Sequence, residues 1–176
     1  MSRTIIKLFF YLCILTALPS YAQNAVHYYF KTMDIRNGLS QNTVYQILQD
    51  RKGFMWFGTK DGLNRYDGLS YCVYKKENSG LGKNFITALY EDHEGNIWIG
   101  TDGGVFIYNP VLDSFTVFNQ TSDKGTVIKD FVTMIGSDEY DNIWISVENQ
   151  GLFCYNHEKK LRNYLYDSGM SNVARF

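Results

Sequence analysis

Short runs of β-branched and aromatic residues, each bounded by Gly, Asn or Asp, follow one another along the chain from residue 43 onward. Four such runs make a group, and the group occurs three times, over residues 43–76, 85–119 and 131–166. Apolar runs of this kind between turn-forming residues predict β-strands joined by tight turns. The second run of a group, such as "NIWIG" at 96–100, is apolar on both faces, as expected for a strand covered by neighbouring sheets. The pattern therefore predicts an all-β chain.

A tryptophan in the second run of each group marks the register of a sequence repeat. Trp56, Trp98 and Trp144 lie 42 and 46 positions apart, and a Gly and a Tyr follow each of them in the same order. Four short strands in a period of about forty residues are typical of a β-propeller blade. A solenoid or a two-sheet sandwich is the alternative, but neither accounts for one tryptophan in a fixed place of a four-stranded unit. We assign a structural role in the repeat to Asp50, Trp56, Gly62, Tyr66, Asp92, Trp98, Gly104, Tyr108, Asp138, Trp144, Gly151 and Tyr155.

The turn before each tryptophan run begins with an aspartate. Its carboxylate can accept backbone N–H bonds within the turn, while Gly53 and Gly95 can supply a positive φ where the hairpin closes. Asp141 stands in this place in the third copy, and Asp is one of the few residues that tolerate the same conformation. We expect each tryptophan to fill the gap between two blades. These residues are therefore predicted to build the fold, not to carry out chemistry.

Residues 1–22 have the pattern of a secretory signal peptide. Arg3 and Lys7 precede an apolar segment at 8–18, and small residues flank Tyr21 before the predicted cleavage site after Ala22. The apolar segment is about half as long as a membrane-spanning helix, so a retained anchor is the less favoured alternative. We therefore predict an exported, periplasmic protein. Because these residues hold two basic and no acidic side chains, cleavage moves the net charge from −1 to −3.

Charge and cysteine content narrow the possible partners. The Lys and Arg residues are scattered and form no basic stripe, so no nucleic-acid partner is expected. Cys72 and Cys154 would lie in an oxidising compartment, where a disulfide is possible. They occupy different places in two different repeats, however, and two separate buried thiols are the preferred interpretation.

The stretch "GLSQNTVYQILQDRKGFMWFGTKDGLNRYDG" at 38–68 resembles the two-component regulator propeller repeat, and the resemblance extends over residues 28–168. It implies that residues 23–176 form a partial β-propeller, with about three four-stranded blades of a seven-bladed ring. The blades are expected at about 40–78, 82–120 and 128–167, with 168–176 starting a further repeat because "GMSN" is similar to "GLSQN". Residues 28–31 resemble the leading strand, which in this family completes the last blade.

The resemblance also implies a function. Members of this family form the periplasmic sensor region of hybrid histidine kinases, with two propellers, a β-sandwich, one membrane helix and kinase modules. They detect oligosaccharides derived from glycans, and the full-length form is expected to be a homodimer. Further blades and a kinase would therefore be partners outside this chain. Three blades without ring closure leave two apolar sheet faces uncovered, so we expect a fragment, a truncated reading frame or part of a larger assembly.

The sequence offers little sign of catalysis. A Gly-rich phosphate loop and the motifs "HExxH", "GxSxG" and Cys-x-x-Cys do not occur. The three histidines occupy different repeat positions, and the turn aspartates could suggest calcium, but each is alone in its turn. We expect no cofactor, metal site or catalytic residue in this chain.

A ligand would be expected on the loops at one face of the ring, before the first strand and between the second and third strands of each blade. These loops mix amide, carboxylate and cationic groups, which suits the hydroxyls of a carbohydrate, although exposed loops are polar in most proteins. The candidate ligand-binding residues are Arg36, Asn42, Lys60, Asn84, Asp102 and Glu148.

The leading hypothesis is a non-catalytic extracytoplasmic sensor segment of a hybrid two-component regulator, which senses an oligosaccharide and signals to a kinase elsewhere. Two alternatives of other classes stay open: a propeller enzyme of the lyase type, and a propeller scaffold that binds proteins. The fold does not choose among them, because propellers serve all three purposes.

Overall fold

The computed structural model describes residues 28–164 of the chain, which divides into two units, residues 1–32 and 33–176. In the first unit only residues 28–32 are described, and they form no strand; Tyr28, Tyr29 and Phe30 are exposed. The leading strand expected at 28–31 is therefore not formed, since a β-strand needs the edge of another strand as its hydrogen-bonding partner. The signal peptide predicted at 1–22 and the further repeat predicted at 168–176 lie outside the described residues.

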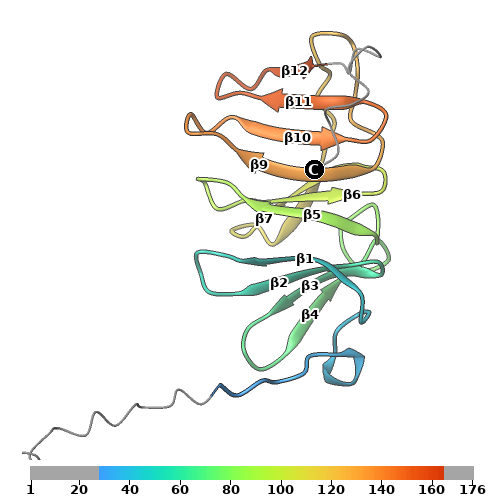
Figure 1. Ribbon diagram of the computed structural model, residues 1–176, viewed down its shortest axis with the longest axis vertical. Helices are drawn as coiled ribbons and strands as arrows, with labels where there is room; N and C mark the ends of the chain where they lie inside the picture. Colours follow the sequence, from blue (N-terminus) through green and yellow to red (C-terminus); the bar gives the residue numbers. More distant parts are fainter. Residues whose placement is uncertain (1–27, 165–176) are drawn as a thin grey trace, which may run out of the picture. The chain divides into compact units, whose positions relative to one another are not determined.

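The second unit contains three four-stranded antiparallel sheets, here called blades 1, 2 and 3, in which consecutive strands are neighbours (Figure 1). Blade 1 consists of β1 (Val44–Gln49), β2 (Met55–Thr59), β3 (Gly62–Tyr66) and β4 (Tyr71–Tyr74). Blade 2 consists of β5 (Ile86–Glu91), β6 (Ile97–Thr101), β7 (Gly104–Asn109) and β8 (Ser114–Phe118). Blade 3 consists of β9 (Val132–Ser137), β10 (Ile143–Val147), β11 (Gly151–Tyr155) and β12 (Leu161–Tyr164). The all-β fold with three four-stranded blades is thereby confirmed.

The only helix among the described residues is the short 3-10 helix η1 (Ile35–Asn37), which precedes blade 1. No described helix is long and apolar enough to cross a membrane.

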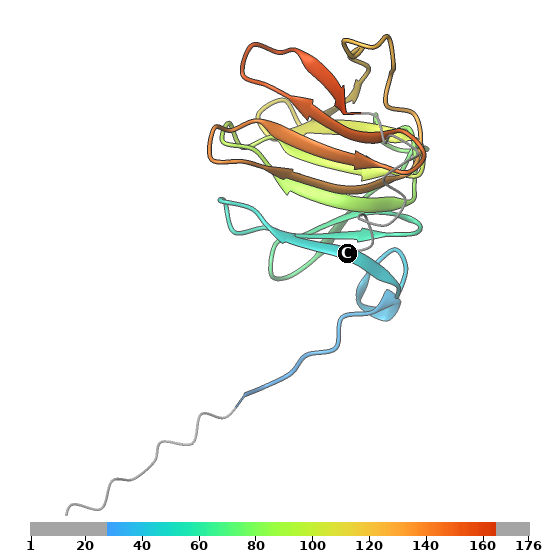
Figure 2. The same cartoon turned by 45° about the horizontal axis from the view of Figure 1, so that its top comes forward.

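The blades follow one another in chain order, with their first strands side by side (Figures 1 and 2). Glycine at one place of the second strand permits this close packing. A Cβ atom added to Gly58 would lie 2.7 Å from Cγ2 of Ile86 in the next blade, and one added to Gly100 would lie 2.7 Å from Cγ1 of Val132. Larger residues at these two positions would force the blades apart. Blade 3 has Ser146 in this place.

Burial along the second strands shows which sheets are covered on both faces. Every residue of β6 is buried, because blade 2 lies between the other two blades. In β10 the buried residues alternate with half-buried ones. The expectation that the tryptophan strand is covered on both faces is therefore confirmed for blade 2, and it holds on one face for blade 3.

Each tryptophan strand is tied to the turn before it by the aspartate of that turn. In blade 1, Oδ1 of Asp50 accepts the backbone N–H groups of Lys52 (3.0 Å) and Phe54 (2.9 Å). Its Oδ2 accepts the indole N–H of Trp56 at 2.8 Å, and the same bond joins Trp98 to Asp92 (2.8 Å) and Trp144 to Asp138 (2.9 Å). The backbone role of the aspartate agrees with the sequence, whereas the bond to the indole was not anticipated.

The predicted left-handed conformation closes these turns. The φ angles are 90° at Gly53, 87° at Gly95 and 60° at Asp141. In blade 3, hydrogen bonds from the Asn142 side chain, followed by the Trp144 indole, lower the pKa of the Asp138 carboxyl to about 2. The turn therefore depends on an ionised carboxylate.

Two of the three tryptophans also join neighbouring blades, as predicted. The ring of Trp56 packs against Tyr108 of blade 2, with centroids 5.1 Å apart, and Trp98 packs against Tyr155 of blade 3 at 5.8 Å. Trp144 packs against Tyr164 of its own blade at 5.6 Å.

The two cysteines of the described residues are separate free thiols, but only Cys154 is buried. The prediction that Cys72 is buried was wrong, because it lies on the outermost strand β4 with its side chain toward solvent. Burial raises the pKa of the Cys154 thiol.

Candidate ligand-binding face

Two sets of loops meet at one end of the three blades. The first residue of each first strand pairs with the end of the second strand: Val44 with Thr59, Ile86 with Thr101 and Val132 with Val147. The loops that enter the first strands therefore lie beside the turns that follow the second strands. We call this end the loop face, formed by residues 38–43, 60–61, 80–85, 102–103, 128–131 and 148–150.

The structure brings three of the six predicted ligand-binding residues together on the loop face. Lys60, Asn84 and Asp102 line a hollow of about 420 Å³ between the loops of blades 1 and 2, together with Lys83 and Phe85. We call it the loop-face pocket. The Lys60 ammonium lies 5.9 Å from the centroid of the Phe85 ring, within the range of a cation–π contact.

The three predicted residues in this pocket differ in the groups that they leave for a ligand. The Asn84 side chain accepts a hydrogen bond from the Lys76 backbone N–H (2.9 Å) and donates one to Glu77 (3.2 Å), so its amide already has partners within the chain. The Lys60 ammonium and the Asp102 carboxylate make no hydrogen bond or ion pair with the described residues and are exposed. Lys60 and Asp102 are therefore the polar groups best placed to bind a ligand.

The other three predicted residues do not line the pocket. Arg36 forms an ion pair with Asp34 (2.5 Å), and the hydrogen bond from its guanidinium lowers the pKa of that carboxyl. Asn42 accepts the backbone N–H of Ile35 at 2.9 Å. Both side chains thus stabilise the 3-10 turn before blade 1. Glu148 is exposed on blade 3, and its backbone N–H donates to the Phe131 carbonyl at 2.8 Å.

An aromatic row crosses the loop face, and sequence reasoning missed it. The rings of Tyr45 and Phe85 have centroids 4.8 Å apart, and those of Phe85 and Phe131 are 5.6 Å apart, so the row runs over all three blades. Each ring stands within one residue of the start of a first strand. The signal in the sequence is an aromatic residue that recurs beside Val44, Ile86 and Val132.

Aromatic rings beside polar groups suit a ligand with both apolar and hydroxyl-bearing surfaces. Phe85 and Phe131 are half-buried and Tyr45 is 47% exposed, so the row presents ring area to solvent. Rings of this kind can pack against the C–H face of a sugar, while Lys60 and Asp102 can bind its hydroxyls. This arrangement can bind a carbohydrate but contains no nucleophile paired with a base.

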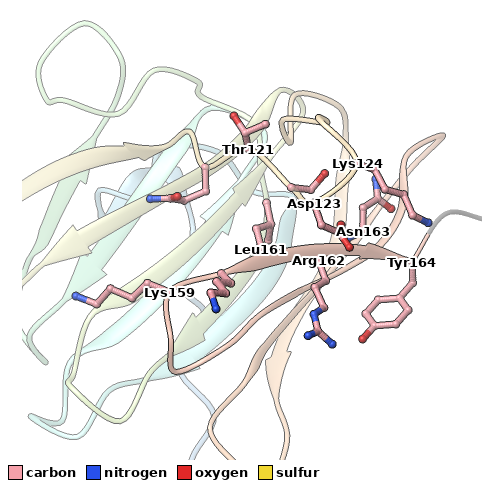
Figure 3. A pocket seen from close by; sticks show the side chains of 11 residues that line it. Thr121, Asp123, Lys124, Lys159, Leu161, Arg162, Asn163 and Tyr164 are labelled. Carbon is pink, nitrogen blue, oxygen red and sulfur yellow. Dashed lines mark hydrogen bonds between the residues drawn. The ribbon is translucent and has the colours of Figure 1, made fainter.

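A larger hollow of about 750 Å³ lies elsewhere, at the outer edge of blade 3, between residues 120–124 and 159–164 (Figure 3). It contains none of the predicted site residues. Three of its four basic side chains, Lys124, Lys159 and Arg162, point in different directions (Figure 3), and the fourth, Lys160, pairs with Glu158. Nothing in the described part of the chain brings three His, Cys, Asp or Glu side chains together as a metal site.

Comparison with known proteins identifies the repeats. The family model of the two component regulator propeller matches residues 38–61 and 80–103, which contain the entry loop and first two strands of blades 1 and 2. Histidine kinase P4 of Formosa agariphila is 42% identical over 59 residues, which are 34% of this chain and 4% of that protein.

Solved structures show the same fold. The extracellular domain of a protein described as a hybrid two component system from B. thetaiotaomicron is 31% identical, with a TM-score of 0.68, over 77% of this chain and 20% of its own. The extracellular domain of a one component system from B. thetaiotaomicron is 25% identical, with a TM-score of 0.65, over 81% of this chain and 22% of its own. This chain thus spans about a fifth of those domains and resembles the extracellular domains of these signalling systems. The recognition made from the sequence is confirmed: the chain carries two-component regulator propeller repeats.

Proposed function

We propose that this chain is a non-catalytic, extracytoplasmic sensor segment whose loop face binds an oligosaccharide derived from a glycan. The observation that carries the proposal is the aromatic row of Tyr45, Phe85 and Phe131 beside Lys60 and Asp102. Similarity to the extracellular domains of a hybrid two component system and a one component system supports a sensing role outside the cytoplasm. In a complete protein, further blades and a kinase would receive the signal.

The proposed mechanism is differential binding. The sugar would pack on the aromatic row and bind Lys60 and Asp102, which lie on turns of two different blades. A ligand that contacts both blades favours the blade arrangement in which both sets of groups are in reach. The bias in that equilibrium would then pass to the rest of the receptor.

Binding measurements with single variants test the proposal. A panel of oligosaccharides released from plant and algal polysaccharides is titrated calorimetrically into the whole chain and into Phe85→Ala and Asp102→Asn variants. We expect at least one oligosaccharide to bind, and each variant to weaken it about tenfold, as expected for the loss of one ring contact or one charged hydrogen bond.

Tyr140→Ala is the matched control, because Tyr140 is an aromatic residue 71% exposed on a turn at the opposite end of the blades. It is expected to bind like the original chain. Retained binding in Phe85→Ala, or an equal loss in Tyr140→Ala, would contradict the loop face as the binding site. If no sugar of the panel binds to a folded sample, the hypothesis that the ligand is an oligosaccharide is contradicted.

A further inference from the structure

The blades also contact each other at the end opposite the loop face. We call this end the turn face; it is formed by the turns between first and second strands and between third and fourth strands. It holds two joints, joint 1 between blades 1 and 2 and joint 2 between blades 2 and 3. The two joints are built from corresponding residues of the repeat, so each serves as a reference for the other.

An arginine fills joint 1. The guanidinium of Arg65 lies over three aromatic rings, with distances to their centroids of 5.0, 5.8 and 5.6 Å; these rings belong to Phe54, Trp56 and Tyr74. It also donates a hydrogen bond of 2.9 Å to the hydroxyl of Tyr108. Cation–π contacts and a hydrogen bond thus hold this guanidinium between the two blades.

Joint 2 repeats part of the aromatic wall without the arginine, and Asn96 stands in the place of Phe54. Trp98, Phe118 and Tyr155 stand in the repeat positions of Trp56, Tyr74 and Tyr108. Their rings have centroids 5.1, 5.8 and 5.0 Å apart. The position of Arg65 is taken in blade 2 by Ile107, which is shorter and cannot donate a hydrogen bond.

The tyrosine hydroxyls of the two joints, those of Tyr108 and Tyr155, differ in their hydrogen bonds. In joint 1, the Tyr108 hydroxyl accepts from Arg65 and donates to Asp113 at 2.6 Å. In joint 2, the Tyr155 hydroxyl has no hydrogen-bond partner within residues 28–164, although Tyr155 is half-buried. The Tyr155 hydroxyl is therefore free to form a hydrogen bond with a ligand.

A second arginine of joint 1 is also replaced. Arg51 donates to the backbone carbonyls of Asp92 (2.5 Å) and His93 (2.7 Å) and forms an ion pair with Glu91 (2.8 Å). His93 occupies the corresponding place in blade 2, and it makes no such bonds to blade 3 among the described residues. Joint 2 is therefore missing both guanidinium groups of joint 1.

The space left in joint 2 is an acidic groove of about 450 Å³. Asp92, Glu94 and Asp141 line it, and Lys159 is the only Lys or Arg among the lining residues described. The corresponding joint 1 residues for Glu94 and Asp141 are Lys52 and Gly95, so the formal charge at these two positions changes from +1 to −2. We call this space the joint 2 groove.

We propose that the joint 2 groove binds a guanidinium group supplied from outside the chain, as an arginine side chain carries. The ligand would occupy the place that Arg65 takes in joint 1, over Trp98 and Phe118, where the Tyr155 hydroxyl stands in the place of the Tyr108 hydroxyl. A planar guanidinium can stack on these rings, donate to the free Tyr155 hydroxyl and pair with Glu94 or Asp141. The inference does not depend on oligosaccharide binding, because the groove lies at the opposite end of the blades.

The test is a titration followed through the indole N–H signal of Trp98 in the whole ¹⁵N-labelled chain. The probes are free L-arginine and a blocked Gly-Arg-Gly peptide, with L-citrulline as the uncharged isostere of arginine. We expect a saturable shift with at least one cationic probe and a response about tenfold weaker with citrulline. A stronger effect of the peptide would indicate a protein segment as the source, and a stronger effect of the free amino acid a small molecule.

Variants locate the site. Ile107→Arg supplies the guanidinium from within the chain, so it should abolish the titration while the chain stays folded. Asp141→Asn should weaken binding severalfold, and Lys159→Gln should strengthen it, because each changes one charge at the rim.

Glu139→Gln is the matched control for Asp141→Asn, because Glu139 is exposed near the same turn and does not line the groove. It should bind as the original chain does. The proposal is overturned if neither cationic probe gives a saturable shift, if arginine and citrulline act alike, or if Ile107→Arg still titrates.

Discussion

Trp98 and Trp144 occupy the same position of two successive repeats and make the same hydrogen bond to a turn aspartate, yet their surroundings differ. Trp98 is 4% exposed because blade 3 covers it, and Tyr155 of that blade packs on its ring. Trp144 is half-buried, and large side chains around it on blade 3 stay exposed, including Leu152 at 39% and Tyr164 at 48%. The hydrogen bond is thus a property of one blade, whereas burial of the indole requires the next blade.

This difference separates two contributions to propeller stability. The turn, its aspartate and the indole N–H act within one short stretch of the chain and are complete in each blade. The apolar contact between blades stabilises the fold more strongly, because it removes aromatic and aliphatic area from water. Each added blade therefore stabilises the one before it, as in other repeat proteins.

Truncation of the two tryptophans is the strongest way to test the comparison. Trp98→Ala should lower the free energy of unfolding by about 3–5 kcal/mol, the cost of removing a large buried aromatic side chain. Trp144→Ala should cost less than half as much, because its ring lacks a covering blade. Urea unfolding measures both, and equal losses would contradict the account. If Trp98→Ala does not fold, Trp98→Phe keeps the comparison measurable against Trp144→Phe.

The glycine that permits close packing offers the next largest effect. Gly100→Ala places a methyl group 2.7 Å from Val132 and should destabilise by about 1–3 kcal/mol. Ser146→Ala, at the corresponding position of blade 3, removes one exposed hydrogen bond with Thr133 and creates no clash. It should therefore change the free energy of unfolding by less than about 1 kcal/mol. Thermal unfolding of both variants gives the comparison, and a neutral Gly100→Ala would show that the blades are not packed this closely.

The turn of blade 3 should show a smaller effect that depends on pH. The pKa of Asp138 is lowered from 3.8 to about 2 when folded, so the folded state binds this proton less readily than the unfolded state. The stabilisation by the ionised carboxylate is complete above the unfolded pKa of 3.8, and it is lost as the pH falls through the folded pKa of about 2. The melting temperature of Asp138→Asn should therefore fall less between pH 4 and pH 2 than that of the original chain. Parallel curves would contradict the ionised turn.

The reactivity of the two thiols compares blades 1 and 3 and has the smallest expected effect on the stability of the fold. Cys72 is exposed, while Cys154 is buried and its thiol pKa is raised by that burial. Because the thiolate is the reactive form, Cys72 should be alkylated by iodoacetamide at least about tenfold faster at pH 8. Denaturant should bring the two rates together, and equal rates in the folded chain would contradict the burial of Cys154.

The sequence predicts most of the fold because the determinants are local and repeated. Strand positions follow from apolar runs, and the left-handed turn residues follow from Gly53, Gly95 and Asp141. Exposure of Cys72 could not be predicted in the same way, because its neighbours in the strand are β-branched and aromatic. Their pattern does not indicate which face of an outer strand is exposed to solvent. The bond between indole and aspartate joins residues six positions apart and depends on the turn geometry, which composition does not reveal.

The candidate site was only partly predictable. Lys60 and Asp102 could be found from their places in turns, because the repeat fixes which turns share a face. Arg36 and Asn42 lie in similar loops, but local hydrogen bonds to Asp34 and Ile35 take up their side chains. The distinction rests on contacts between particular atoms, which the alternation of polar and apolar residues does not determine.

Sugar binding at the loop face can be mapped from the backbone amide shifts of the ¹⁵N-labelled chain during titration with an oligosaccharide that binds. We expect the largest shifts on residues 60–61, 83–85, 102–103 and 131, around Phe85 and the loop-face pocket. Shifts confined to the turn face, or spread evenly over the chain, would contradict it.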